Sequence, residues 1–194
     1  MIEKNNKRNE ILNSARMLFK ENGFHKTKME DIAIGANVGK GTLYEYFKSK
    51  QEIFDEVCVD YVKSIHKYVK EIKDMNISFN EKLFLLFKGK EAAFEEDFDK
   101  NPINYIMSYK NIISEKFVIT LFEYISEMNT IIIEMIDQGK DEGVVKKEIP
   151  SEMVACSIVG TMSEYSKLKL HKKNNSLSKD DIIFDLLYNG FGEK

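Results

Sequence analysis

Residues 29–54 read MEDIAIGANVGKGTLYEYFKSKQEIF, and this stretch decides how the N-terminal part of the chain folds. Apolar residues such as Ile32 and Ala33 recur at helical spacing, residues 37–39 interrupt the pattern, and Leu43 resumes it. Two short helices joined by a tight turn form the unit that places its second helix in the major groove of DNA. The stretch therefore predicts a helix–turn–helix.

The second helix of this unit carries side chains suited to DNA. Gly39 and Gly41 leave its first turn bare, so its backbone N–H groups can approach a phosphate closely. The predicted DNA contacts are Thr27, Gly39, Lys40, Gly41, Thr42, Tyr44, Tyr46, Lys48 and Lys50. Each has an alternative interpretation: the tyrosines pack on the protein, Lys48 and Lys50 are solvated, and Thr27 only caps the helix that follows it.

The charges are distributed unevenly along the 194 residues. Residues 1–50 hold ten Lys and Arg against six Asp and Glu, whereas the remaining 144 residues hold 19 bases and 26 acids. A basic end on an acidic body indicates that the end contacts a polyanion.

The whole chain is expected to be all-α. It has two prolines, and apolar residues recur at spacings of three and four almost throughout. Serine or threonine followed three residues later by an acid predicts helix starts at Thr27, Ser49, Ser78 and Ser178. About nine helices are expected, including residues 7–21, 40–47, 114–141, 150–169 and 178–190, and one that begins at Pro102.

Several classes of protein are disfavoured. The longest apolar run, residues 83–87, is too short to span a membrane, and the N-terminus has no apolar signal core. Two distant cysteines form no disulfide framework, which indicates the cytoplasm. No catalytic constellation, cofactor motif or metal-ligand spacing is present, so we expect neither an enzyme nor a metal or cofactor.

Residues 8–56 resemble the DNA-binding domain of the TetR/AcrR family of transcriptional repressors. The resemblance rests on residues 29–54 and on the upstream pattern Ile11-Leu-x-x-Ala-x-x-Leu-Phe19. It implies a DNA-binding domain at residues 1–50, and a helical domain for effector binding and dimerisation at residues 51–194. The chain departs from the family at Gly35, where a polar residue is common, and at Gly39, where a hydroxyl residue is usual. These glycines suggest the hypothesis of a loosely held recognition helix that firms up on DNA.

The resemblance also implies a small effector that binds among the later helices. Aromatic residues and methionines crowd that region, and an apolar or aromatic effector is expected. The predicted effector residues are Phe87, Tyr105, Tyr109, Tyr124 and Met128, each of which has core packing as its alternative.

The last two long helices have apolar faces larger than one chain easily covers. The resemblance implies a homodimeric four-helix bundle there, and the expected interface residues are Met153, Ile158, Met162, Ile183 and Leu187. Gly160 is expected to permit close approach across it. The predicted function is that of a repressor which an effector releases from a palindromic operator. The alternative is a helical small-molecule carrier or adaptor that has lost DNA binding, with Gly35 and Gly39 as signs of decay.

Overall fold

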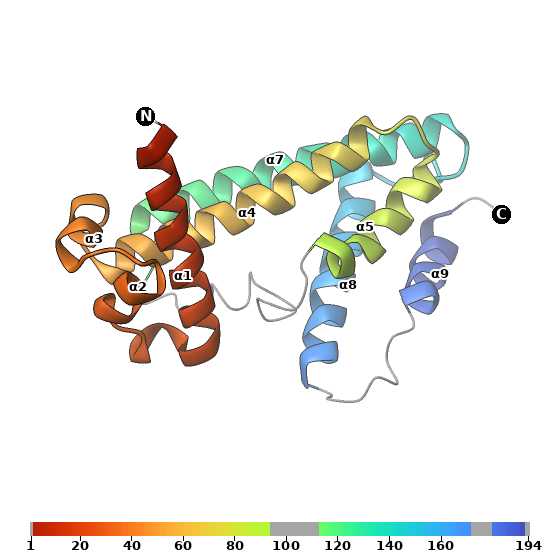
Figure 1. Ribbon diagram of the computed structural model, residues 1–194. Coiled ribbons are helices and arrows are strands. Elements are labelled where there is room, and N and C mark those ends of the chain that lie inside the picture. Colours follow the sequence, from red (N-terminus) through yellow and green to blue (C-terminus); the bar gives the residue numbers. More distant parts are fainter. Residues whose placement is uncertain (1, 94–112, 172–179, 193–194) are drawn as a thin grey trace. The chain divides into compact units, whose positions relative to one another are not determined.

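A computed structural model describes residues 2–93, 113–171 and 180–192. These residues form helices and no strand (Figure 1). The helix expected after Pro102 and the cap expected at Ser178 lie outside the described residues. The helices are α1 (Ile2–Lys26), α2 (Met29–Gly35), α3 (Lys40–Tyr46), α4 (Lys50–Asp74), α5 (Phe79–Ala93), α7 (Glu115–Asp141), α8 (Ser151–His171) and α9 (Asp180–Phe191).

The described residues form two compact units, and the long helices α4 and α7 each contribute to both. Residues 2–63 and 113–122 form the first, which we call the headpiece unit. Residues 64–93, 123–171 and 180–192 form the second, the body unit. The packing boundary therefore runs through α4 at residue 63, beyond the domain limit at residue 50 that was expected from the sequence.

The headpiece unit has an aromatic core that fixes the helix–turn–helix. Phe19, Phe47 and Phe54 are fully buried, and the rings of Phe19 and Phe54 meet edge to face with centroids 5.3 Å apart. Leu43 anchors α3 and Ile32 anchors α2 to this core, and both are fully buried. Because aromatic pairs add to the stability that burial provides, this small unit has a well-defined interior. The predicted helix–turn–helix is confirmed.

The turn between α2 and α3 includes residues 37–39, where the sequence pattern predicts an interruption. Asn37 adopts a left-handed conformation with φ 51°, which asparagine tolerates better than most residues. The N–H of Val38 then donates to the carbonyl of Ala33 at 2.9 Å. Gly39 is the N-cap of α3 and has an extended backbone.

Of the three capping boxes that fall on described residues, the one at Ser78 is confirmed, because Ser78 and Glu81 hydrogen-bond to each other reciprocally. The box at Ser49 is half formed: the N–H of Glu52 donates to Oγ of Ser49 at 3.1 Å, but the Glu52 carboxylate accepts from the N–H of Lys48 at 2.6 Å. The box at Thr27 is wrong, because the Thr27 hydroxyl donates backwards to carbonyls of α1. The helix predicted at residues 7–21 extends further at both ends, over Ile2–Lys26, with a break at Gly23 where φ is 73°.

Gly35 has a packing role that the sequence did not indicate. A Cβ atom on Gly35 would overlap Oγ of Ser14 on α1 and lie 3.4 Å from its Cβ. Ser14 is itself 7% exposed, and its hydroxyl donates to the carbonyl of Ile32 at 3.0 Å. Gly35 therefore allows α1 and α2 to approach closely. This packing role explains the glycine without a loss of DNA binding.

Gly35→Ala is expected to destabilise the protein by about 1–2 kcal/mol, because overlap in a packed contact outweighs the better helix propensity of alanine. Combining it with Ser14→Ala removes the overlapping oxygen, so the double variant should be more stable than the sum of the single changes predicts. Urea unfolding of the four proteins measures this coupling. Additive effects would show that Ser14 does not restrict residue 35.

The body unit is held by apolar residues from α4, α5, α7, α8 and α9. Ile72, Phe79, Leu83 and Ile136 are among its most deeply buried side chains. The predicted helices at 114–141 and 150–169 are confirmed within one or two residues at each end. Gly143 ends α7 with φ 73°, as a glycine after a helix commonly does.

Candidate functional site

The outer surface of α3 is the candidate DNA-binding face. Leu43 is fully buried, whereas Gly41 and Glu45 lie on the opposite side of the helix and are exposed. Tyr44 is 45% exposed beside them, and Thr42 is half-buried on the other flank. A Cβ atom on Gly41 would meet nothing within 4 Å, so this face is open.

Lys40 begins α3 and pairs with Glu30 of α2. Its Nζ donates to Oε1 of Glu30 at 2.6 Å, and both side chains are largely exposed. The hydrogen bond lowers the pKa of the Glu30 carboxyl and raises that of the Lys40 ammonium. Both groups are therefore charged near neutral pH, and Lys40 is held at the edge of the face on which it was expected.

Lys50 has a different role from the predicted one. Its Nζ donates to the carbonyls of Phe24 at 2.6 Å and Thr27 at 2.7 Å, and it lies 4.4 Å from the centroid of the Phe24 ring. Burial lowers the pKa of this ammonium. Lys50 thus joins the start of α4 to the end of α1 and to the segment after it. Its ammonium group donates these hydrogen bonds within the protein.

Thr27 is also internal rather than available to DNA. It is 2% exposed, and its hydroxyl donates to the carbonyls of Leu18 at 3.1 Å and Gly23 at 2.8 Å. Lys48 is exposed just after α3. Tyr46 is half-buried at the end of α3. Lys48 and Tyr46 therefore remain candidates for DNA contact. The burial of Thr27 argues against the DNA contact that was predicted for it.

Glu45 is not among the DNA contacts that the sequence predicts. The structure places Glu45 one turn after Gly41 on the open side of α3. A carboxylate in the major groove accepts a hydrogen bond from the N4 amino group of cytosine. The signal in the sequence was the four-residue spacing from Gly41.

The predicted dimer residues divide between the inside and the outside of the body unit. The prediction that Ile158 lies at the dimer interface is wrong, because this residue is 1% exposed and belongs to the core of its own chain. Met153 is 61% exposed, and Ile183 is half-buried. Met162 and Leu187 pack against the core. The apolar residues exposed on α8 and α9 are Met153, Val159, Ile182 and Leu186, and we call them the outer apolar face.

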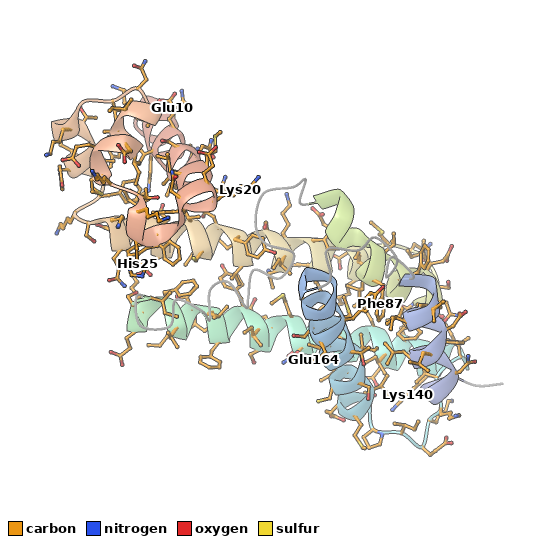
Figure 2. The ribbon with its side chains drawn as sticks, turned by 90° about the horizontal axis from the view of Figure 1, so that it is seen from below. Glu10, Lys20, His25, Phe87, Lys140 and Glu164 are labelled. Carbon is orange, nitrogen blue, oxygen red and sulfur yellow. The ribbon has the colours of Figure 1, made fainter. Side chains whose placement is uncertain are left out.

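The predicted effector residues that the structure describes lie in the body unit, and Tyr105 and Tyr109 lie outside the described residues. Phe87 on α5, labelled in Figure 2, meets Phe184 of α9 with ring centroids 6.2 Å apart. Met128 is 9% exposed in the same core. Tyr124 meets the ring of His66 at 5.2 Å instead. Phe87 and Met128 therefore share one core, and Tyr124 does not line it.

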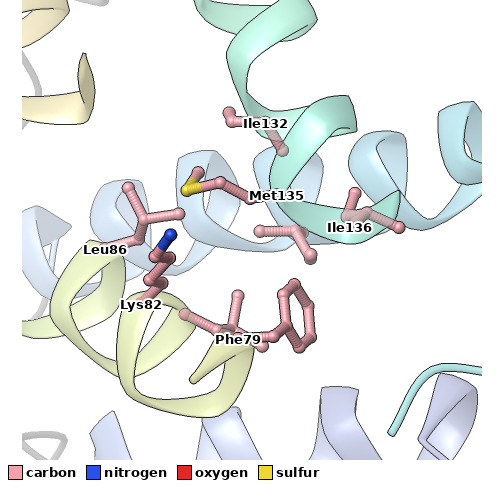
Figure 3. Close-up of a pocket in the computed structure, with 8 residues that line it drawn as sticks. Phe79, Lys82, Leu86, Ile132, Met135 and Ile136 are labelled. Atoms are coloured by element: carbon pink, nitrogen blue, oxygen red, sulfur yellow. The ribbon is translucent and has the colours of Figure 1, made fainter. Parts of the chain in front are cut away.

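A small recess lies between α5, α7 and α8, and it contains none of the predicted effector residues. Figure 3 shows Lys82 running among apolar side chains that include Leu86 and Met135. The Lys82 ammonium donates to the carbonyl of Lys73 at 2.6 Å and to Oε1 of Gln138 at 2.8 Å. The recess has no room for a water molecule, so it is packed core in this conformation.

Neither a metal-ligand cluster nor a membrane-spanning helix occurs in the described part of the chain. No three His, Cys, Asp or Glu side chains there are grouped so as to hold a metal ion. Among the same residues, every helix is too short or too polar to cross a bilayer.

A short helix that is anchored by Leu43, follows a left-handed turn and presents an open polar face defines a helix–turn–helix DNA-binding protein. Comparison with known proteins makes the assignment more specific. Residues 11–57 match the model of the family "Bacterial regulatory proteins, tetR family". Residues 11–57 are therefore a DNA-binding domain of the TetR type, and the chain is similar to transcriptional regulators of that family.

The similarity to family members extends beyond the headpiece unit. The transcriptional repressor KstR2 of Mycobacterium tuberculosis is 27% identical over 77% of this chain and 74% of its own length. The fatty acid metabolism regulator protein of Bacillus subtilis is 23% identical over the full length of both chains. The crystal structure of FadR from B. subtilis in complex with stearoyl-CoA has a TM-score of 0.70 at 20% identity, with coverage of 94% of this chain and 98% of that one. These relatives are regulators, and FadR shares the fold of this chain.

Proposed function

We propose that the chain is a cytoplasmic, homodimeric repressor that binds a palindromic operator and leaves it when a small apolar effector binds. It acts by binding rather than by catalysis. In this proposal residues 1–50 bind DNA, and residues 51–194 bind the effector and form the dimer. The single observation that carries the proposal is the open outer face of α3, whose opposite side is locked into the core by Leu43. Selection of duplexes from a random library should return a two-fold symmetric sequence.

The proposed contacts divide into base readers and phosphate binders. Lys40, Thr42, Tyr44 and Glu45 occupy the outer part of α3, where base edges are read in the major groove. Gly39, Gly41, Tyr46 and Lys48 lie where the backbone of the duplex would approach, and they supply affinity without sequence information. Thr27 and Lys50 are not in this set, because their polar atoms are bonded within the protein.

Lys48 and Lys50 form a matched pair of lysines with opposite expected effects. Lys48→Ala should weaken binding to all duplexes and lower the slope of log affinity against log salt by about one, the contribution of one phosphate contact. Lys50→Ala should leave that slope unchanged and destabilise the protein by about 1–3 kcal/mol, because buried carbonyls lose a charged donor. Salt titrations and urea unfolding distinguish the two. If both variants lowered the slope of log affinity against log salt equally, Lys50 would be a phosphate contact as well.

The effector is proposed to be largely apolar and to bind in the body unit among α5, α7 and the helices around them. Phe87, Tyr124 and Met128 are the proposed contacts within the described residues, and Tyr105 and Tyr109 remain proposed outside them. The apolar character of this core supports the proposal, as does the binding of stearoyl-CoA by FadR, a relative of the same fold. Because the recess between α5, α7 and α8 is filled, an effector that enters this recess must favour a conformation in which these helices separate.

A long acyl thioester is the first effector to test. Stearoyl-CoA should release the protein from the selected duplex, whereas coenzyme A should not, if the apolar chain supplies the differential affinity for the two conformations. Fluorescence anisotropy of a labelled duplex measures the release. An equal response to both compounds would show that the coenzyme A portion and not the apolar chain is recognised.

A further inference from the structure

Arg8 of α1 connects the last residues of α3 to α4. Its Nε donates to Oε1 of Glu56 at 2.8 Å, and its Nη2 donates to the other carboxylate oxygen. Its Nη1 lies 3.4 Å from the carbonyl oxygen of Tyr46, the last residue of α3. The guanidinium carbon lies 4.4 Å from the centroid of the Phe47 ring, which is fully buried.

This arrangement fixes the end of the recognition helix. The last carbonyls of a helix have no partner within it, so a donor from outside restrains where that end lies. A guanidinium is planar and presents its donors in a fixed fork, which lysine does not do. Arg8 uses this fork to hold the Glu56 carboxylate and the end of α3 together, and its stacking on Phe47 limits its own movement.

We propose that Arg8 and Glu56 are positioning residues for DNA recognition: they hold α3 against the first turns of α4 at the angle at which it enters the groove. The inference rests on the proposed function. Lys50, six residues before Glu56, ties the start of α4 to Phe24 of α1 and to Thr27. The first turns of α4 therefore hold the end of α3 through Arg8, and the end of α1 through Lys50.

The charge of Glu56 makes the proposal testable, because electrostatics and positioning predict opposite changes in DNA affinity when that charge is removed. A carboxylate near a polyanion opposes binding, so removal of its charge should strengthen DNA binding if electrostatics alone matter. If Glu56 positions α3 through Arg8, its removal weakens specific binding instead. Arg8 gives a second criterion, because an arginine that contacts phosphate contributes to the salt dependence, whereas one that positions a helix does not.

The experiment uses the full-length protein and two duplexes: one selected by the wild-type protein from a random library, and one of scrambled sequence. The variants are Glu56→Gln, Arg8→Gln and Arg8→Lys. Asp60→Asn is the matched control, since it removes a half-buried carboxylate one turn further along α4. Affinity for both duplexes, salt slope and the midpoint of urea unfolding are measured for each protein.

Glu56→Gln and Arg8→Gln are each expected to weaken binding to the selected duplex by about tenfold, the loss typical of one misplaced base contact. Affinity for the scrambled duplex and the salt slope should not fall, Asp60→Asn should not reproduce the loss, and Arg8→Lys should restore binding only in part. Unchanged or stronger specific binding by folded Glu56→Gln would overturn the inference. Failure of the wild-type protein to distinguish the two duplexes would overturn the proposed function itself.

Discussion

Gly41→Leu is expected to leave the protein folded and to weaken binding to the selected duplex by about 100-fold, the effect of losing two contacts of about 1–3 kcal/mol each. Residue 41 lies on the exposed side of α3, where an added Cβ meets nothing within 4 Å. The protein itself therefore accepts a larger side chain. A leucine there occupies the space through which the duplex must approach, so the steric conflict arises only in the complex.

The same substitution should raise rather than lower stability. Glycine within a helix is less favourable than leucine by roughly 0.5–1 kcal/mol, because the glycine backbone loses more conformational entropy on folding. Gly41→Ala is the matched control, which gives the stability gain with a smaller obstruction. Urea unfolding and fluorescence anisotropy measure the two effects. If Gly41→Leu were more stable and bound the duplex as tightly as wild type, α3 would not enter the groove by this face.

Leu186→Arg is expected to dissociate the dimer and to reduce affinity for the selected duplex by about 100-fold or more, because two linked half-site contacts strengthen binding by 10²–10⁴. Leu186 is 68% exposed on α9, and α9 packs against α8, which carries Met153 and Val159. Large apolar side chains that are exposed on neighbouring helices commonly mark an interface. A two-fold axis brings each substitution near its own copy, so an unpaired charge is buried there twice.

Dissociation can be distinguished from unfolding by a matched substitution. Asn129→Arg adds the same side chain at an exposed position of α7 and should leave both the dimer and the affinity unchanged. Light scattering at defined concentration gives the mass of each variant. A dimeric Leu186→Arg protein with full affinity would move the interface away from the outer apolar face.

The sequence predicted the headpiece unit well because its signals are local. The turn at residues 37–39 and the apolar position of Leu43 are both specified within a few residues, and the structure bears out both. The open face of α3 followed from the same register. Local chemistry also predicted the reciprocal bonds of Ser78 with Glu81.

Contacts between segments distant in the sequence were not predictable in this way. Lys50 and Thr27 carry polar groups suited to DNA, but their partners are carbonyls of α1 and of the segment after it. Gly35 requires the serine that lies opposite it on α1. The hydrogen bond that Arg8 donates to the carbonyl of Tyr46 likewise joins residues 38 positions apart.

The prediction of the dimer residues on α8 was partly wrong for a different reason. α8 carries apolar side chains on both its inner and outer sides, since Ile158 is buried and Met153 is exposed. Periodicity alone cannot decide which side packs within the chain when both are apolar. The packing of Ile158 against α5 and α7 decides it, and Met153 is left on the outer side.

The central claim is that two copies of α3 enter successive major grooves at a fixed separation. The most direct test measures the affinity of the full-length protein for its selected palindrome and for the same duplex with about five base pairs inserted at the centre, which turns one half-site to the opposite side of the helix. We predict that the insertion lowers affinity by about 100-fold or more, to that of a single half-site. Equal affinity for both duplexes would contradict the account.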